Sequence, residues 1–164
     1  VAYRTLDTPI GSLLIAATEV GLVRVAFQWS EHEDVLQQLA DHVSPRVLHA
    51  PRRLDDAATQ IDAYFIGRRR TFDLPLDMRL ATGFRREVLD ALLRIDYGHT
   101  ASYAAVAHDA GRPKAVRAVG TACAVNPLPL VIPCHRVIRS DGTLGEYGGG
   151  REAKHALLTL EGAL

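Results

Sequence analysis

The second half of the chain contains its most distinctive stretch, NPLPLVIPCHRVI, at Asn126–Ile138. The apolar run Leu130–Ile132 is typical of a short buried strand, and Pro133 would end its hydrogen-bond ladder because proline has no N–H to donate. Cys134 would then stand at the end of a rigid, buried element. We expect a positioned nucleophile at this place.

Cys134 is the candidate nucleophile, and His135 beside it is the candidate base. A thiol attacks as its thiolate, so its ordinary pKa of about 8.5 must be lowered, or a base must take the proton during attack. Successive side chains of a regular strand point to opposite faces, which would keep these two apart. Either the backbone turns after Pro133, or a water molecule relays the proton. Most Cys-His pairs are structural, so other parts of the chain must decide the role.

Upstream, the sequence predicts two short helices, about Ser102–Ala110 and Lys114–Ala124, joined by Gly-Arg-Pro. Thr100 or Ser102 is a suitable N-cap, and Pro113 suits the first position of the second helix, where an N–H is not needed. This is a helix-turn-helix pattern, which occurs in DNA-binding proteins and in ordinary packed helix pairs.

The second of these helices carries many small side chains, with Arg117 as its long basic one. The small residues are Ala115, Ala118, Gly120, Thr121, Ala122 and Ala124. They fit either close packing on a neighbouring helix or entry into a narrow groove, with Arg117 as the probe. Residues 111–139 include five basic residues and no acidic one, Arg112, Lys114, Arg117, Arg136 and Arg139. That stretch is either an electropositive face for phosphates or a solvated loop face.

A glycine-rich loop, Gly145–Gly150, follows and holds one aromatic ring, Tyr147. Three consecutive glycines allow close backbone approach to a flat ligand. The spacings of phosphate-binding loops are absent. The alternative is a flexible connector.

The first part of the chain has the pattern of an antiparallel meander followed by two amphipathic helices. We expect strands at 3–6, 13–16 and 22–27 and helices at Glu31–Asp41 and Leu54–Ile66. We predict an α/β (α+β) fold with two domains. Residues 1–80 form a small antiparallel sheet with covering helices. Residues 81–164 form a mainly helical domain with the helix-turn-helix, a short active-site strand and further helices at 84–93 and 151–161.

Bulk composition narrows the class of protein. The 164 residues are 48% hydrophobic, and 19 basic residues cancel 19 acidic ones. No apolar run approaches the roughly 18 residues that cross a bilayer, and Val1–Thr8 lacks a signal-peptide pattern, so we expect a cytoplasmic protein with no membrane partner. Cys123 and Cys134 are too few for a disulfide scaffold and lie in no metal-ligand spacing, so we expect free thiols and no metal.

These residues together resemble the O6-alkylguanine-DNA alkyltransferases, also called methylated-DNA-protein-cysteine methyltransferases. Pro133–Val137 matches the family's active-site motif. The likeness covers nearly the whole chain. Its other matches are Tyr64, Phe65, Gly67, residues 72–76, Phe84–Arg86, Val88, Leu89, Ser102, Tyr103, Ala115, Arg117–Gly120, Asn126, Pro127, Tyr147, Gly149 and Gly150.

The resemblance implies direct-reversal repair: a damaged guanine is flipped out of duplex DNA, and its alkyl group moves irreversibly to Cys134, once per molecule. It implies that His135 is the base acting through a water and that Glu161 orients it. Tyr147 would donate towards the guanine and protonate the leaving base, and Asn126 would be the hinge before the active-site strand. No cofactor is implied, and activity on O4-alkylthymine stays open.

The resemblance also implies binding to the minor groove of double-stranded DNA by a monomer, with cooperativity on DNA left open. Arg117 would fill the space of the flipped base, and Tyr103 would crowd its phosphate. Further DNA contacts are expected from Ala118, Gly120, Lys114 and Arg136. The purine pocket is expected to include Val137, Gly148, Gly149 and Pro129.

Two departures from the family pattern stand out. Gly148 replaces a serine of some relatives, so a contact with O6 there must come from backbone, and Cys123 replaces an apolar residue and is expected to be a small core side chain. Two alternatives to alkyl transfer are a helix-turn-helix regulator that binds DNA without chemistry and a cysteine hydrolase using Cys134 and His135.

Overall fold

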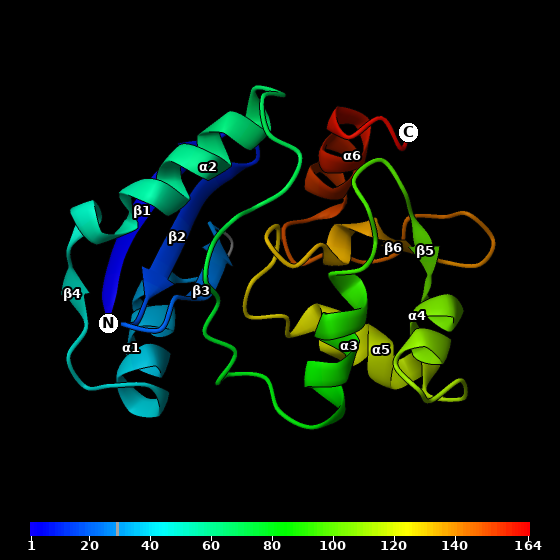
Figure 1. Ribbon diagram of the computed structural model, residues 1–164, viewed down its shortest axis with the longest axis horizontal. Coiled ribbons are helices and arrows are strands. Elements are labelled where there is room, and N and C mark those ends of the chain that lie inside the picture. Colours follow the sequence, from blue (N-terminus) through cyan, green and yellow to red (C-terminus); the bar gives the residue numbers. More distant parts are fainter. Residues whose placement is uncertain (29) are drawn as a thin grey trace. The chain divides into compact units, whose positions relative to one another are not determined.

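The computed structural model describes residues 1–28 and 30–164, which form two compact units, Val1–Leu80 and Ala81–Leu164 (Figure 1). The first unit is built on a sheet and the second is mainly helical, as the sequence predicts. Within the described ranges, no helix is long and apolar enough to cross a membrane.

The sheet of the first unit has four strands in the order β3-β2-β1-β4. They are β1 (Ala2–Thr8), β2 (Gly11–Ala17), β3 (Leu22–Phe27) and β4 (Leu48–His49). The first three form the predicted antiparallel meander. The prediction of a purely antiparallel sheet is wrong, because β4 pairs with β1 in parallel and makes the sheet mixed. A two-residue strand with both side chains exposed carries no alternation to reveal it.

Both faces of this sheet are covered. Four consecutive residues of β2, Leu13–Ala16, are buried, which requires packing on both sides since strand side chains alternate. Helix α1 (His32–His42) packs Val35 and Leu39 on the face of Leu14 and Ala16. The 3-10 helix η1 (Pro51–Leu54) and helix α2 (Asp55–Phe65) contact β1 and bury an apolar face that includes Ile61.

The proline-marked segment near residue 75 pairs with the start of β3. Leu22 donates its N–H to the Pro75 carbonyl at 2.9 Å, and Asp77 donates to the Leu22 carbonyl at 2.8 Å. A Cβ at Gly21 would lie 2.3 Å from the Pro75 oxygen, so this approach requires glycine. The segment therefore completes the first unit.

The second unit packs α3 (Phe84–Leu92), α4 (Tyr103–Asp109) and α5 (Val116–Ala124) against one another, followed by α6 (Arg151–Leu160). Ser102 caps α4, accepting from the Ala105 N–H at 3.0 Å, which confirms one of the two predicted caps. The expectation that Pro113 opens the next helix is wrong. Pro113 lies in a turn closed by the Ala115 N–H and the Arg112 carbonyl at 2.9 Å, and α5 starts at Val116.

Two short strands of this unit join the helix-turn-helix to the segment that follows Cys134. β5 (Ala101–Ser102) pairs in parallel with β6 (Val137–Ile138). Because Tyr103 directly follows β5, this pairing fixes the start of α4 beside the chain that leaves the cysteine. The candidate site is therefore contained within the second unit.

Candidate active site

The backbone bends sharply on each side of the proline that precedes the cysteine. The predicted strand Leu130–Ile132 is wrong: Leu130 has φ 76°, a left-handed conformation seen at no other non-glycine residue that the structure describes. Pro133 (φ −81°, ψ 65°) forms an inverse γ-turn, in which Cys134 donates its N–H to the Ile132 carbonyl at 2.8 Å. The cysteine then begins a short 3-10 helix, η2 (Cys134–Arg136). The backbone therefore turns after Pro133, which is one of the two alternatives that the sequence left open.

The buried Asn126 side chain holds this bent loop together. Its Nδ2 donates to the Ile132 carbonyl at 3.0 Å, and its Oδ1 accepts from the Leu128 N–H at 2.9 Å. The amide thus ties both ends of the loop to one point. Burial raises the pKa of Cys134, and a side-chain hydrogen bond from Asn126 opposes that rise. Asn126 therefore both shapes the loop and interacts with the Cys134 thiol.

Three buried polar side chains form a network behind Cys134. His135 Nε2 lies 2.8 Å from Glu161 Oε2. Arg136 donates to the same carboxylate from Nε at 2.8 Å and from Nη2 at 3.0 Å. Its Nη1 donates to the Ile95 carbonyl at 2.7 Å. Such a two-nitrogen contact fixes both the charge and the orientation of the carboxylate.

This network corrects the expectation that Arg136 contacts DNA. Its side chain is only 10% exposed, and its charge is paired with Glu161, so it cannot reach a phosphate. The sequence groups it with the other basic residues of 111–139, but the carboxylate that binds it lies 25 residues further along the chain.

The two nitrogens of His135 have different surroundings. Nε2 faces Glu161, whereas Nδ1 is buried and has no hydrogen-bond partner among the described residues. Burial lowers the pKa of His135 despite the opposing effect of Glu161, so the ring is neutral near pH 7. With Nε2–H donated to the carboxylate, Nδ1 is left as an acceptor that is able to take a proton.

Cys134 needs such a base. Its residue is 5% exposed, and burial raises the pKa of its thiol, while Asn126 and the charge of Lys154 pull the pKa down. Burial is the largest of these effects, so the resting group is the protonated thiol. Deprotonation must accompany the reaction.

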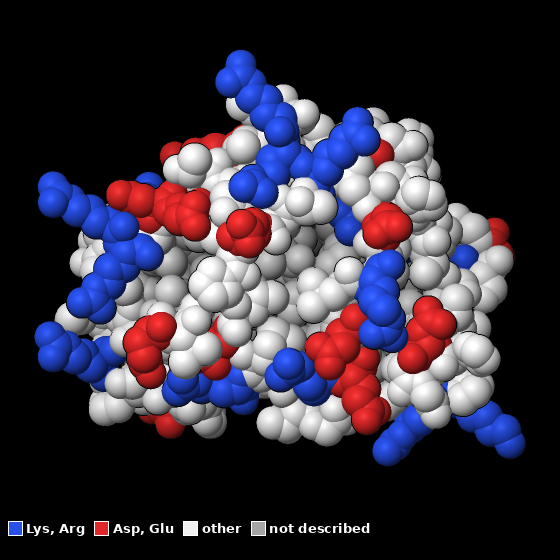
Figure 2. All heavy atoms as spheres, in the orientation of Figure 1, with Lys and Arg blue, Asp and Glu red and all other residues white. Residues whose placement is uncertain are grey.

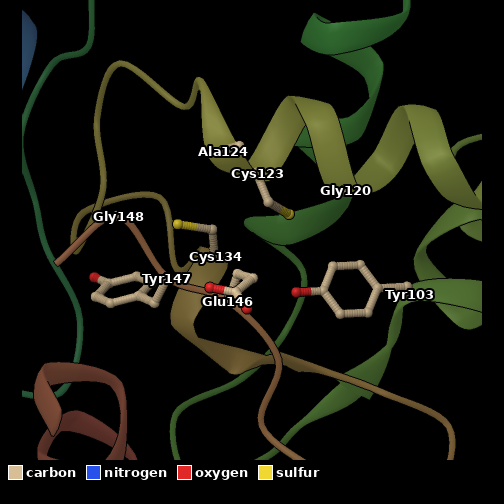
Figure 3. A pocket seen from close by; sticks show the side chains of 8 residues that line it. All are labelled: Tyr103, Gly120, Cys123, Ala124, Cys134, Glu146, Tyr147 and Gly148. Atoms are coloured by element: carbon tan, nitrogen blue, oxygen red, sulfur yellow. The ribbon is translucent and has the colours of Figure 1, made fainter. Parts of the chain in front are cut away.

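The sulfur of Cys134 borders a cavity of about 200 Å³, shown in Figure 3. Its lining consists of Tyr103, Gly120, Cys123, Ala124, Cys134, Glu146, Tyr147 and Gly148. Tyr103 points its hydroxyl into the cavity from the side opposite Tyr147. Helix α5, the start of α4 and the glycine-rich loop therefore enclose the thiol together.

A larger open groove of about 660 Å³ adjoins this cavity along α5. The two hollows share Tyr103, Gly120, Ala124 and Glu146. Arg117 and Thr121 line the groove from α5, and Arg139 lines it from the loop after β6. The exposed face of the small-residue helix thus adjoins the cavity that Cys134 borders.

The other predicted site residues fall into two groups. Lys114 and Ala118 are exposed, so both are accessible to a partner. Of the four residues expected to form the purine pocket, Gly148 lines the cavity, whereas Val137, Gly149 and Pro129 are buried and are not among its lining residues. On the face drawn in Figure 2, basic and acidic side chains are interspersed within each unit and form no single basic patch.

Sequence reasoning missed the surroundings of two residues. Cys123 is partly exposed and lines the cavity, so its assignment to the core is wrong; burial and the neighbouring Cys134 raise its pKa to about 12. Lys154 is fully buried on the apolar face of α6 beside Leu157 and Leu158. Its position at three residues before one leucine and four before the next is a periodicity signal that would have indicated burial.

Among the described residues, no group of three His, Cys, Asp or Glu side chains is arranged to hold a metal ion.

Both units match models of one protein family. Residues 83–163 match "6-O-methylguanine DNA methyltransferase, DNA binding domain", and residues 1–78 match the "ribonuclease-like domain" of the same proteins. The chain belongs to this methyltransferase family. A methylated-DNA-protein-cysteine methyltransferase of Mycobacterium tuberculosis is 41% identical over 161 residues, covering 98% of this chain and 92% of that protein. The constitutive enzyme of Bacillus subtilis is 40% identical over 163 residues, covering 97% and 94%.

A solved structure of a family member has the same fold. The crystal structure of Mycobacterium tuberculosis OGT in complex with DNA superposes with a TM-score of 0.86 at 40% identity, covering 99% of this chain and 94% of that one. The resemblance read from the motifs is thereby confirmed at the level of family and fold.

Proposed function

We propose that this protein repairs O6-alkylguanine in double-stranded DNA by moving the alkyl group to Cys134. The observation that carries the proposal is a buried thiol on a cavity that opens into the groove along α5, with a neutral histidine and its carboxylate behind it. Family membership supports the same reaction, as does the DNA bound to the Mycobacterium tuberculosis relative.

The groove along α5 is the proposed DNA surface. Small side chains such as Ala118 and Gly120 let the helix enter the minor groove, and the exposed Arg117 fills the space that the target base leaves. Extruding a base costs a few kcal/mol, least for a lesion that pairs poorly. Tyr103 stands where the groove meets the cavity, so we assign it the displacement of the phosphate next to the target.

The transfer itself forms one bond and breaks one. Cys134 Sγ bonds to the alkyl carbon while the bond between that carbon and guanine O6 breaks, and the electron pair of that bond stays with the guanine. The thiol proton passes through a water to His135 Nδ1, and the Tyr147 hydroxyl donates a proton to the departing guanine. The tyrosinate then regains a proton from the imidazolium through solvent, so the net change moves the thiol proton to guanine. The Glu161 carboxylate stabilises the imidazolium that forms.

The product is a thioether on Cys134, which offers no route back to the thiol. Each molecule therefore acts once, and restored guanine equals consumed protein. We further propose that a single molecule suffices for the reaction, because the cysteine, the base and the DNA surface all lie in residues 81–164.

The test is to mix the protein with duplex DNA holding one O6-methylguanine and to locate the added methyl group by peptide mass analysis. We expect one methyl on Cys134 and an equal amount of restored guanine. Cys123→Ser is the matched control, because this thiol lines the same cavity and should be dispensable.

Three results would contradict the proposal. A methyl group on Cys123 would show that Cys123, and not Cys134, accepts the alkyl group. DNA bound without modification would favour a regulator that lacks chemistry. Repeated turnover of an ester by Cys134 and His135 without DNA would favour a hydrolase.

A further inference from the structure

Lys154 is an unusual residue at this site. It and Lys114 are the only lysines in a chain with 19 basic residues. Lys114 is exposed, whereas Lys154 is fully buried on α6. Lysine is almost never fully buried unless its charge is paired, so the burial of Lys154 beside the cavity points to a role for the charge.

The contacts of its ammonium group are two backbone carbonyls. Nζ donates to the Val137 oxygen at 2.6 Å and to the Glu146 oxygen at 3.3 Å. The Glu146 carboxylate lies at the surface, where it pairs with Arg151 at 3.2 Å. Within the described part of the chain, Lys154 thus has carbonyl dipoles but no ion pair to balance its buried charge.

These two carbonyls lie at opposite ends of one loop. Val137 begins β6, three residues after the acceptor, and Glu146 precedes Tyr147 and Gly148 on the glycine-rich loop. The Lys154 ammonium therefore connects the backbone at Val137, just after Cys134, to the backbone at Glu146, which lines the cavity. An apolar residue would pack beside Leu157 and Leu158 without the cost of a buried charge, but it would make neither contact.

The charged and titratable groups that face Lys154 are two thiols, the side chains of Arg139 and Glu146, the Tyr103 ring at 6.0 Å and His135. Thiolates at Cys134 and Cys123 would favour the ammonium, and Arg139 opposes it. Burial lowers the pKa of Lys154, and its charge in turn lowers the pKa of Cys134. The anion that would balance this cation is the thiolate formed during reaction.

We propose that Lys154 is a positioning residue for alkyl transfer: its ammonium ties Val137 to Glu146 and stabilises the nascent Cys134 thiolate across the cavity wall. This inference rests on Cys134 being the acceptor. It adds to the histidine route a second, purely electrostatic source of thiol activation, which acts without receiving the proton.

The experiment compares Lys154→Met with Lys114→Met, using the small reagent methyl iodide and no DNA. Methionine keeps much of the side-chain volume and removes the charge and both hydrogen bonds. Methylation of Cys134 is followed by peptide mass analysis from pH 6 to pH 10, a range that contains the ordinary thiol pKa of about 8.5. We expect the midpoint to rise by about one pH unit in Lys154→Met, which is roughly tenfold slower reaction near pH 7. Lys114→Met should match the wild type.

A loss of rate with an unchanged midpoint would overturn the electrostatic role, since a merely loosened structure slows reaction at every pH alike. Lys154→Arg retains the charge and should keep the midpoint near that of the wild type. A midpoint for Lys154→Arg equal to that of Lys154→Met would also contradict the proposal.

A measurement on the unaltered sequence covers the case in which these variants do not fold. Two lysines give two side-chain NMR signals in protein with labelled lysine. Methylation of Cys134 removes the potential anion, so we expect Lys154 to titrate at lower pH afterwards while Lys114 stays unchanged. An unchanged Lys154 titration would overturn the inference. Failure of O6-methylguanine DNA to methylate wild-type Cys134 would instead overturn the proposed function.

Discussion

The buried side of the site and the exposed face of α5 are built on opposite principles. Cys134, His135 and Glu161 are almost fully buried, and the histidine and the carboxylate are hydrogen-bonded to each other. Arg117 and Ala118 are exposed on a helix of small side chains. Burial strengthens electrostatic interactions and fixes geometry, which suits proton transfer, whereas a duplex requires an accessible and narrow surface. Substitutions in the two regions should therefore produce different kinetic defects.

Tyr103 is the point at which these regions meet. It follows β5, which pairs with β6 after the acceptor, and it lines both the cavity and the groove. A Cβ on Gly145 would lie 3.2 Å from its hydroxyl, so the glycine-rich loop packs closely on the same ring. A displacement of Tyr103 on the proposed DNA surface would therefore reach the lining of the cavity directly.

The largest effect is expected from Glu161→Gln on the buried side. The change removes the charge that holds Arg136 and supports a positively charged His135. We expect transfer to slow by about 10²–10⁴-fold on both duplex DNA and free O6-methylguanine, as for loss of general acid-base catalysis. The unpaired Arg136 should also cost about 3–5 kcal/mol of unfolding free energy, measured by urea denaturation.

Glu152→Gln is the matched control, because this carboxylate is exposed in the first turn of the same helix. Its rates and stability should resemble those of the wild type. A Glu161→Gln protein that transfers at the normal rate would remove the histidine route from the mechanism.

A smaller and more selective effect is expected from Arg117→Ala. The side chain lines the exposed groove and has no place in the buried network. Single-turnover repair of duplex DNA should slow about tenfold or more, while transfer from the free base should be unchanged, because extrusion is needed only for the duplex. Arg85→Ala on α3 is an exposed arginine control. Equal losses with duplex and free base would erase the distinction between the two regions.

The smallest effect is expected from Gly120→Ala, which lies where groove and cavity meet. An added Cβ meets nothing within 4 Å, so the helix should gain about 0.5–1 kcal/mol of stability. Duplex repair should slow a few-fold, because the methyl group narrows the approach to the thiol. Gly67→Ala gives the reverse pattern, since φ is +77° there: lower stability and normal repair. Unchanged duplex repair in Gly120→Ala would show that the base does not pass this point.

Several elements could be predicted from local sequence because their causes are local. The meander follows from short apolar runs separated by turn residues in residues 1–27, and the start of α4 follows from Ser102, whose hydroxyl caps the next turn. The loop before Cys134 could not be predicted in this way. An apolar run is compatible with a strand, and only the buried Asn126 amide, with its two hydrogen bonds, favours the left-handed Leu130 and the turn at Pro133.

The sequence alone determined the helix-turn-helix pattern, the run of small residues around Arg117 and the presence of a thiol next to an imidazole. Tertiary structure decided the partners and the ionisation states of the polar groups in the site. It withdrew Arg136 from solvent to bind Glu161, left His135 Nδ1 as an acceptor and placed Lys154 beside two carbonyls. The physical reason is that a pKa depends on burial and on charges a few ångströms away, and those neighbours come from residues distant in the chain.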